Sequence, residues 1–495
     1  MTSRLTHRKL KIIFFLFDYD TPPPQMNKSR ENCYNKWLKL ANLQEKEYQK
    51  DAIDWCLRKE TEYKGGLLAD EMGLGKSYVM MGLIAVKPLQ TLIVVPPALL
   101  EQWKEILTKF LHPPSIYHGS HKNKINFGRI VLTTYNLLLR LKIRKKTWER
   151  VIYDEAHHLR NDDSDKYMGA KRIKSKINWM VTGTPIQNKK NDLYSLCRIL
   201  KISIKTPIEN FCLRRTKEDV GLKLPKITIH NELVDWKTKA ETDFALDIHS
   251  LLKLTGITGR SFNPMLDTLK QTGSGFAAIM RARQACVLPE LILKNLQQFI
   301  ITEDLDTEWV TNGYIESLST SKIDAVISTI TKRDNGRSKL VFCHFRKEID
   351  EICERLGYLK VGVIDGRTSK KERQNILKSS TLPNWLCNQI TDQLVPNQGT
   401  DFLPKLINEY LTYDIAVVQI QSCCEGLNLQ QFQEVYFTTP HWNPAVEDQA
   451  IARCYRQGQT KSVDVFKFCM KFKDNRKTLD EHCLEVQSFK RELWF

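Results

Sequence analysis

The sequence predicts an α/β fold of two lobes, each built around a parallel sheet, with a helical insertion between them. Three observations predict it. Short, fully apolar runs alternate with helical patterns from about residue 40 to 230, and such strands between helices indicate a parallel sheet that is covered on both faces. From about 235 to 320 the pattern is helical. A second alternating series begins near residue 322, and a length of 495 residues suits two or three domains.

The apolar runs locate the expected strands. In the first series they are 91–97, 129–135, 150–156 and 178–184, and in the second 339–345, 360–366, 414–420, 434–439 and 463–468. The expected domains are an N-terminal extension (1–38), a first lobe (39–232), a helical insertion or linker (233–320), a second, C-terminal lobe (321–475) and a tail (476–495). Residues 12–17 form an apolar run after basic residues. It is too short for a signal peptide and lacks a small-residue cleavage site, so a short strand is expected there.

The charge balance points toward a polyanionic partner. Lys and Arg number 75 against 57 Asp and Glu, a formal net charge of +18, and nucleic acid is the usual partner of such an excess. A basic but indifferent surface is the alternative. The 13 cysteines include no Cys-x-x-Cys pair, so we expect reduced thiols in an intracellular protein and no zinc site. No run approaches membrane-spanning length, and no membrane partner is expected.

A candidate phosphate-binding loop ends in Gly75-Lys76-Ser77. An apolar stretch precedes it and an apolar helical pattern follows, the context in which backbone N–H groups cradle phosphates. Lys76 would then reach the β and γ phosphates, and Ser77 would ligate Mg²⁺. The general phosphate-loop pattern has a glycine at the position of Asp70. A chance Gly-Lys-Ser is therefore the alternative.

An acidic pair ends the apolar run 150–156. Asp154 and Glu155 come at the carboxyl end of a predicted strand, where the Mg²⁺ of a bound nucleotide belongs in an α/β sheet. Asp154 would hold Mg²⁺ through water, and Glu155 would orient or deprotonate the attacking water. A helix cap beside a solvated acid is the alternative. The position of the pair about 80 residues after Gly-Lys-Ser favours the catalytic interpretation.

Two arginines of the second lobe complete the candidate chemistry. Arg453 and Arg456 lie three residues apart on a predicted helix, so one helix face would carry both. If the two lobes close on ATP, these side chains can act as arginine fingers on the γ-phosphate. The alternative is a basic surface helix.

These stretches together resemble the motif series of the Snf2-type ATPases of helicase superfamily 2. The matching segments are "LLADEMGLGKS", "TLIVVPPALLEQW", "YDEAHHLRN", "VTGTPIQN", "LRRTKEDV", "GLNL" and "HWNPAVEDQAIARCYRQGQ". They occur in the family's order across residues 45 to 470. In that family the first loop position is typically Asp, so Asp70 is the family's own variant, and the resemblance implies two RecA-like lobes that use ATP and Mg²⁺.

The resemblance also implies roles for individual residues. Gln49 matches the adenine-recognising glutamine, and Gln459 closes the arginine motif near the nucleotide. The implied phosphate loop is Ala69, Asp70, Glu71, Met72, Gly73, Leu74, Gly75, Lys76 and Ser77. The implied DEAH motif is Asp154, Glu155, Ala156 and His157, with His157 as a coupling residue. The implied coupling and DNA-backbone positions are Thr182, Gly183 and Thr184 together with Thr133, Thr134, Thr368 and Ser369.

The segments "MRARQACVLPELI" and "HWNPAVEDQAIARCYRQGQ" narrow the resemblance to the Rad5/Rad16-like branch, which includes lodestar-type transcription termination factors. The absence of paired Cys/His clusters argues against that branch's RING finger. No chromatin-reading module is expected, because the motor fills the chain. The sequence is also similar to the global transactivator-like proteins of baculoviruses. Nuclear location, in the host if viral, would follow, with transcription machinery or nucleosomes as further partners.

Two departures from the family pattern stand out. Ser422, Cys423, Cys424 and Glu425 replace the usual small residues before "GLNL", and glycines there would allow close backbone approach to DNA. The insert 376–412 is longer than usual, and its apolar content suggests that it packs. The leading hypothesis is a double-stranded DNA translocase. The rivals are a strand-separating helicase, for which no wedge segment is evident, and a non-catalytic DNA-binding transactivator with a relic ATP site.

Overall fold

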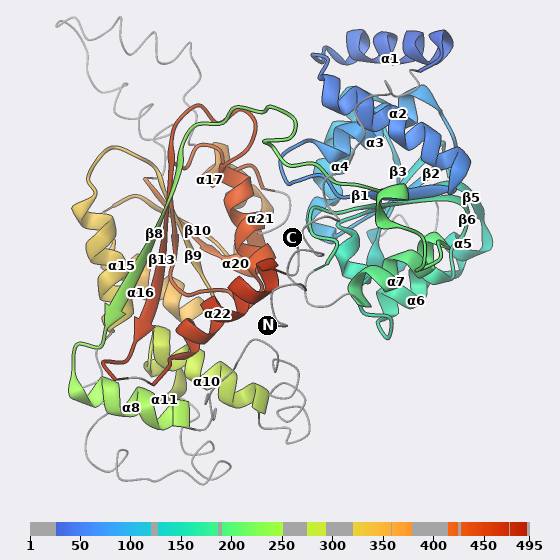
Figure 1. The fold of residues 1–495 in the computed structure, drawn as a ribbon. Coiled ribbons are helices and arrows are strands. Elements are labelled where there is room, and N and C mark those ends of the chain that lie inside the picture. The colour runs from blue at the N-terminus through green and yellow to red at the C-terminus, as the bar shows by residue number, and fades with distance from the viewer. Residues whose placement is uncertain are drawn as a thin grey trace, which may run out of the picture. The chain divides into compact units, whose positions relative to one another are not determined.

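The computed structural model describes residues 26–119, 127–186, 191–250, 275–293, 320–357, 359–378, 414–423, 427–474 and 476–492. The chain divides into two compact units, one formed by the residues up to Lys223 and those from Lys490 onward, and one from Leu224 to Phe489. Each unit contains its own sheet (Figure 1). The apolar N-terminal run at 12–17 lies outside the described residues, as does the insert beyond residue 378.

The first unit is built on a seven-stranded sheet in the order β3-β4-β2-β5-β6-β1-β7. All of its described pairings are parallel. Its strands are β1 (Gly65–Leu68), β2 (Thr91–Val95), β3 (Ser115–Tyr117), β4 (Ile130–Thr134), β5 (Thr147–Asp154), β6 (Lys174–Val181) and β7 (Cys212–Leu213). Its helices are α1 (Lys28–Ala41), α2 (Glu47–Glu62), α3 (Lys76–Val86), α4 (Leu100–Phe110), α5 (Leu141–Lys145), α6 (Asp165–Lys171) and α7 (Asn191–Leu200).

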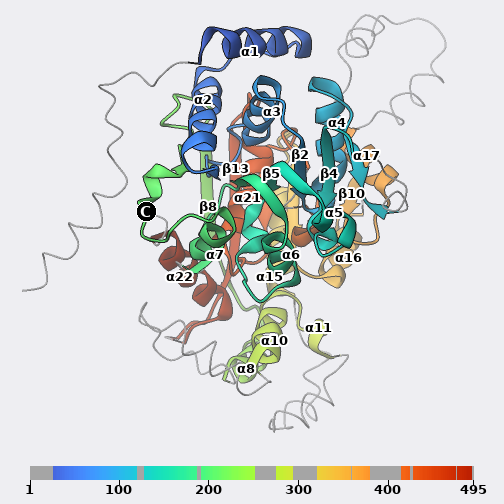
Figure 2. The ribbon, with the colours of Figure 1, turned by 90° about the vertical axis from the view of Figure 1, so that its right-hand side faces the viewer.

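Helices cover both faces of this sheet, which explains why its strands are apolar throughout. Along β2, Ile93 and Val95 join the core formed with α1 to α4, whereas Leu92 and Val94 join the core formed with α5 to α7. Figure 2 shows these two sets of helices on opposite sides of the strands. A strand that is buried on both faces gains from apolar side chains at every position.

A buried ion pair ties α2 to β5. The Arg150 Nε and Nη2 atoms donate to the two carboxylate oxygens of Glu60 at 2.6 and 3.0 Å, and the Trp179 indole N–H donates to Glu60 Oε1 at 3.1 Å. Burial alone would raise the pKa of Glu60, but the Arg150 guanidinium outweighs burial and lowers it. The carboxylate therefore stays charged and satisfied inside the protein. This pair fixes the helix that carries Gln49 against the strand that ends in Asp154.

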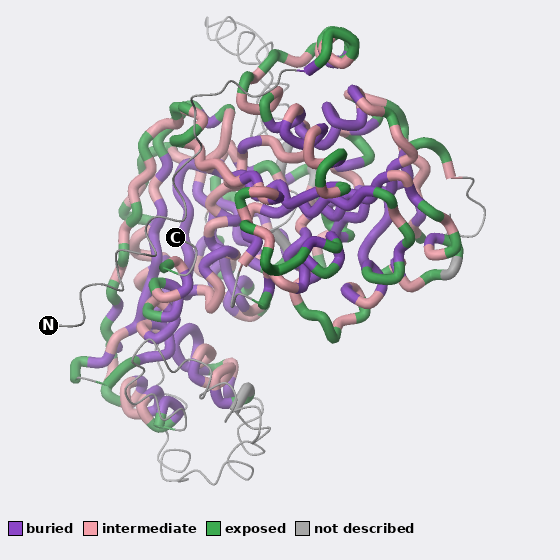
Figure 3. The backbone as a smooth tube through the Cα atoms, turned by 45° about the vertical axis from the view of Figure 1, so that its right-hand side comes forward, coloured by how far each residue is buried: buried purple, intermediate pink, exposed green. Residues whose placement is uncertain are grey.

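The second unit is built on a six-stranded parallel sheet in the order β10-β11-β9-β12-β13-β8. Its strands are β8 (Ile227–Asp235), β9 (Lys339–Cys343), β10 (Val361–Ile364), β11 (Ile415–Gln419), β12 (Glu434–Phe437) and β13 (Val463–Lys471). Its helices are α8 (Lys239–Ser250), α10 (Gly275–Val287), α11 (Glu290–Leu293), α15 (Ser321–Lys332), α16 (Arg346–Arg355), α17 (Lys370–Lys378), α20 (Ile420–Cys423), α21 (Pro444–Cys454) and α22 (Leu479–Glu492). Figure 3 shows that burial concentrates along the central strands.

The predicted fold class is confirmed, and each of the nine apolar runs from 91–97 to 463–468 overlaps a strand. The second sheet has one strand that was not expected, β8, which pairs with β13 along its whole length. β8 crosses the domain boundary expected at 232, and the division into compact units falls earlier, between Lys223 and Leu224. After β8, the described part of the segment predicted as a helical insertion contains α8, α10 and α11. Its Ala245 and Cys286 pack in one core with Val341 of β9.

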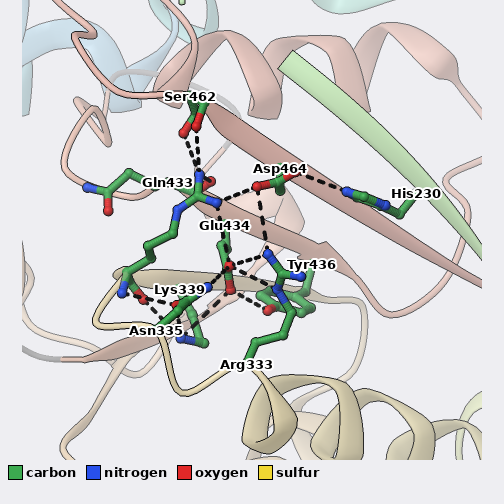
Figure 4. A network of polar contacts seen from close by, with 10 residues as sticks. His230, Arg333, Asn335, Lys339, Gln433, Glu434, Tyr436, Ser462 and Asp464 are labelled. Atoms are coloured by element: carbon green, nitrogen blue, oxygen red, sulfur yellow. Dashed lines mark hydrogen bonds and ion pairs between the residues drawn. The ribbon is translucent and has the colours of Figure 1, made fainter. Parts of the chain in front are cut away.

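A polar network stabilises the amino ends of the second sheet's strands (Figure 4). Glu434 is buried at the start of β12. It accepts from Arg333 Nε at 2.9 Å and from the Tyr436 hydroxyl at 2.6 Å. Asp464 accepts from Arg337 and lies 3.0 Å from His230 Nε2. The predicted nucleotide and DNA motifs follow the carboxyl ends of strands, so this network at the opposite edge is structural.

Candidate functional site

Three sequence motifs of the first unit meet at one edge of its sheet. The phosphate loop follows β1, the acidic pair follows β5, and Thr182 follows β6. β6 lies between the other two strands, because Val181 pairs with both Leu68 and Asp154. All three strands are parallel, so their carboxyl ends share the edge at which α/β sheets bind ligands.

The phosphate loop is a glycine-dependent turn that leads into α3. Gly73 and Gly75 have φ of +94° and +81°, a region that residues with a Cβ rarely enter. A Cβ added at Gly75 would lie 2.5 Å from Gln49 Nε2, and that amide donates to Leu74 O at 3.0 Å. Lys76 begins α3 and its Nζ donates to Asp70 O at 2.8 Å. The structure therefore brings Gln49, the loop and Lys76 together.

Asp70, the residue that departs from the general phosphate-loop pattern, has a clear structural partner. Its buried carboxylate accepts from Arg215 Nε at 3.1 Å, from Nη2 at 2.6 Å and from the Arg215 backbone N–H at 3.0 Å. Arg215 belongs to the segment "LRRTKEDV", for which the sequence suggested no role. A glycine at position 70 would leave this guanidinium without its carboxylate.

The acidic pair at the end of β5 is held on both sides. Asp154 Oδ2 accepts from the Trp103 indole N–H at 2.7 Å, and Oδ1 accepts from the Glu155 backbone N–H at 3.0 Å. Burial first, and then the neighbouring charge of Glu155, raises the pKa of Asp154 to about 6. Glu155 has φ 50° and ψ 50°, a left-handed conformation that is uncommon outside glycine and often marks a functional residue. Sequence reasoning did not identify Trp103.

Hydrogen-bonding atoms connect the acidic pair to the Thr182 motif. His157 Nδ1 lies 3.2 Å from Glu155 Oε2 and 3.4 Å from Thr182 Oγ1. The Thr184 backbone N–H donates to Thr182 Oγ1 at 3.2 Å. A Cβ added at Gly183 would lie 2.7 Å from Met72 Cγ and 3.3 Å from Lys76 Nζ. The Thr182 motif therefore lies close to both the DEAH motif and the phosphate loop.

The structure corrects part of the predicted DNA-contact set. Thr133 and Thr134 stand at the end of β4 as expected, but both are fully buried. Thr133 Oγ1 donates to Tyr117 O at 2.9 Å, and Thr134 Oγ1 lies 3.4 Å from His118 Nδ1. These hydroxyls are not presented to a DNA backbone here, because both side chains are buried beside Tyr117 and His118.

The two hydroxyls expected near the end of β10 differ from each other. Thr368 Oγ1 donates to Val363 O at 3.0 Å and accepts from the Asp365 N–H at 2.9 Å, so it closes its own turn. Ser369 is exposed, and its Oγ accepts from the Glu372 N–H at 3.2 Å at the start of α17. Only Ser369 of this pair lies at the surface as a backbone contact would need.

The arginine motif departs from its predicted geometry. α21 ends at Cys454, because Tyr455 has φ −97° and ψ 80° and leaves the helical conformation. Arg453 is therefore on the helix and Arg456 lies beyond it, so the prediction of one shared helix face is wrong. Gln459 is buried and its amide donates to Gln430 O at 2.7 Å and Cys454 O at 3.2 Å. These bonds organise the loop after α21.

Some predicted features lie wholly or partly outside the described residues. Cys424 and Glu425 are among them, whereas α20 ends at Cys423. The start of the insert belongs to α17, where Ile376 is buried in a core with Leu340 and Phe342. Within the described ranges, no helix is long and apolar enough to cross a membrane.

Two family models match the chain. Residues 48–207 match the SNF2-related domain and residues 321–384 match the helicase conserved C-terminal domain. These matches, together with the loop, acidic pair and coupling motif at one sheet edge, define an ATPase of helicase superfamily 2 with two RecA-like lobes. The chain therefore carries Snf2-type helicase-superfamily ATPase domains and is an ATP-hydrolysing enzyme.

The chain is similar to several known proteins. It is 27% identical over 515 residues to an "uncharacterized ATP-dependent helicase" of Mycoplasma genitalium, covering 95% of this chain and 44% of that protein. It is 24% identical over 584 residues to the Arabidopsis thaliana "DNA repair protein RAD5B", covering 87% and 45%. It is 24% identical over 465 residues to the "probable global transactivator" of Orgyia pseudotsugata multicapsid polyhedrosis virus, covering 85% of each. The chain thus spans less than half the length of the first two.

Proposed function

We propose that this protein is an ATP-dependent double-stranded DNA translocase of Snf2 type that acts on transcription or chromatin in the nucleus. The observation that carries the proposal is the meeting of Lys76, the Asp154–Glu155 pair and Thr182 at one edge of the first sheet. The net charge of +18 supports a nucleic-acid partner. The names of the RAD5B and transactivator relatives support DNA repair or transcription as the setting.

The residues at this edge fit a nucleoside triphosphate with Mg²⁺. The glycine turn and the amino end of α3 provide backbone N–H groups for phosphates. Lys76 carries the positive charge, and the Ser77 hydroxyl and the Asp154 carboxylate are the oxygen ligands that Mg²⁺ prefers. When bound, Mg²⁺ would neutralise charge on the phosphates. Gln49, which already bonds the loop, would recognise the adenine.

Different residues of the chain would then carry out different parts of ATP hydrolysis and DNA binding. Glu155, which has a left-handed backbone conformation, would orient the attacking water. His157 would couple Glu155 to Thr182, because its Nδ1 atom lies within hydrogen-bonding reach of both side chains. The arginines of the second lobe would stabilise the charge that develops on the γ-phosphate. Surface groups such as Ser369 would hold the DNA backbone.

Trp103→Phe should specifically weaken the use of Mg²⁺. The substitution keeps an aromatic ring but removes the N–H that fixes Asp154 Oδ2 at 2.7 Å. A hydrogen bond to a charged group contributes about 1.5–3 kcal/mol, so the Mg²⁺ concentration for half-maximal ATPase activity should rise about tenfold or more. The measurement is a Mg²⁺ titration of ATP hydrolysis.

Trp148→Phe is the matched control for this experiment. Its indole N–H donates to Ile143 O at 3.2 Å near the opposite end of β5, so it loses a buried indole bond away from the acidic pair. Its Mg²⁺ requirement should stay near that of the unmodified protein. The same Mg²⁺ curve in both variants would mean that Trp103 does not position Asp154 for a metal.

The proposed function predicts a specific nucleic-acid dependence of ATP hydrolysis. Duplex DNA should stimulate the purified protein more than single-stranded DNA, RNA or no nucleic acid. Backbone contacts alone can move one strand without opening base pairs, so ATP should drive removal of a third strand from a duplex. ATPase rates with each nucleic acid and a triplex displacement assay measure this.

The outcomes separate the rival functions. Efficient unwinding of a paired fork would replace the translocase by a helicase, because separation costs about 1.4 kcal/mol per base-pair step and needs a device to hold the fork open. Strong DNA binding with no ATPase activity would favour a transactivator with a relic ATP site. Stimulation by RNA alone would overturn the DNA substrate.

A further inference from the structure

The segment from Phe211 to Ile227 connects the two compact units, and we call it the connector. It contains β7 in the first unit and ends where β8 begins in the second. In the first unit it runs alongside the phosphate loop, because the Ala69 N–H donates to Leu213 O at 2.7 Å and the Glu71 N–H donates to Arg215 O at 2.8 Å. The connector therefore extends the sheet edge that carries the loop.

Arg215 fastens the connector to the phosphate loop. Its guanidinium forms two hydrogen bonds with the Asp70 carboxylate, at 3.1 and 2.6 Å, and a third with Tyr48 O at 2.7 Å. The carboxylate is buried, so the pair is shielded from water and resists separation. Asp70 O in turn holds Lys76 Nζ. One residue of the connector thus touches the loop residue that positions the catalytic lysine.

Lys217 adds a second attachment on the neighbouring loop residue. Its backbone N–H donates to Glu71 Oε2 at 2.8 Å, and its Nζ donates to Glu71 Oε1 at 2.7 Å. The two acids of the "DEMGLGK" loop therefore bind two successive basic positions of the connector. A change in the loop's backbone must pull on the connector or break these bonds.

The other end of the connector is fastened to the arginine motif. The Tyr455 hydroxyl donates to Pro225 O at 2.8 Å, and the Val463 N–H donates to Lys226 O at 3.0 Å. Tyr455 lies between Arg453 and Arg456, at the point where α21 ends. Arg456 therefore sits on irregular backbone whose position depends on what Tyr455 contacts.

We propose that Arg215 and Tyr455 are positioning residues that couple the phosphate loop of one lobe to the arginine motif of the other through the connector. The inference rests on the proposed function, in which the two lobes act together on one ATP. Arg215 holds the connector against the phosphate loop, and Tyr455 holds it against the arginine motif. Neither side chain needs to touch the nucleotide.

The test is a double-variant cycle of Tyr455→Phe and Arg215→Lys in the full chain. Tyr455→Phe removes one hydroxyl and should lower kcat about threefold to tenfold, the scale of one neutral hydrogen bond, while KM for ATP stays within about twofold. Arg215→Lys loses the paired fork on Asp70. It should raise KM about tenfold and lower kcat to a similar degree as Tyr455→Phe.

The double variant decides between coupling and two local effects. If the connector couples the phosphate loop to the arginine motif, the loss of the Arg215 contact already breaks the coupling. Removal of the Tyr455 hydroxyl should then lower kcat no further, so the kcat of the double variant should equal that of Arg215→Lys. Effects at separate, independent sites multiply instead, and a product of the two kcat losses would overturn the proposal. An unchanged kcat in Tyr455→Phe would overturn it as well. Melting temperatures of all variants show that each is folded.

Two controls match the substitutions chemically. Arg198→Lys alters an exposed arginine that pairs with Asp162 at 2.6 Å in the first unit, and Tyr436→Phe removes a buried hydroxyl at the amino edge of the second sheet. Both should leave kcat and KM unchanged. Arg456→Ala distinguishes a failure of the proposed coupling from a failure of the proposed function. If Arg456→Ala lowers kcat but the cycle is multiplicative, only the coupling fails; if Arg456→Ala has no effect, the proposed function fails first.

Discussion

Glu155→Gln should leave the protein able to bind ATP while its turnover falls by about 10²–10⁴-fold, the range expected when a general base is lost. The substitution keeps the size of the side chain but removes the charge that orients and accepts a proton from water. The left-handed backbone at Glu155 tolerates glutamine as well as glutamate, since both carry the same Cβ. Binding of a fluorescent ATP analogue and steady-state hydrolysis, measured on the same preparation, test the expectation.

Lys76→Ala provides the contrast. The Lys76 ammonium lies in the loop, 2.8 Å from Asp70 O, so its loss should weaken nucleotide binding as well as abolish turnover. Glu149→Gln is the control for charge, because Glu149 belongs to the same strand but accepts from the Gln90 N–H at 2.7 Å near its other end. Unchanged turnover in both Lys76→Ala and Glu155→Gln would disprove the assignment of this edge as the hydrolytic site.

Strand prediction succeeded for the longer strands that are buried on both faces, whereas the four-residue β1 was not among the expected strands. β2 has five buried residues in a row, and such runs are visible in a sequence because both faces need apolar side chains. β8 was missed because it mixes Ile229 and Leu233 with His230 and Asn231, and it lies at the edge of its sheet. Ile229 and Leu233 are exposed. An edge strand buries fewer apolar side chains, so its sequence shows no continuous apolar run.

Partners that lie far apart in sequence account for most of what the motifs did not predict. Asp70 and Arg215 are separated by 145 positions, and Trp103 and Asp154 by 51. No spacing rule joins such residues, since folding alone brings them together. The motif series identified the residues that perform chemistry, whereas the residues that hold them required the structure.

Two local errors have local physical reasons. After Pro444 at its start, the helix that carries Arg453 meets no glycine or proline until Gly458, so nothing in the sequence indicated that it ends at Cys454. Thr133 and Thr134 were correctly placed at a strand end, but their exposure depends on β3, a three-residue strand beside β4. A strand that short gives almost no sequence signal.

Arg456→Ala should lower kcat by about 10³ while the affinity for ATP stays nearly unchanged. An arginine finger stabilises charge that appears only in the transition state, where its contribution is about 10³–10⁵ in rate. Because α21 ends at Cys454, removing this side chain does not disturb a helix. The Arg453 carbonyl accepts from the Leu429 N–H at 3.1 Å, a backbone contact that Arg453→Ala keeps. A fall in kcat in either variant at an unchanged melting temperature would report the loss of the guanidinium.

The measurement is ATPase kinetics with saturating duplex DNA, together with ATP binding at equilibrium. Lys461→Ala is the control, because it removes an exposed positive charge from the loop that follows the motif while its backbone N–H still bonds Gln459 Oε1 at 3.0 Å. If Arg456→Ala raises only KM, the second lobe binds nucleotide in the ground state and is not a finger. If Arg456→Ala and Lys461→Ala behave alike, general positive charge near the loop, and not a positioned guanidinium, supports hydrolysis.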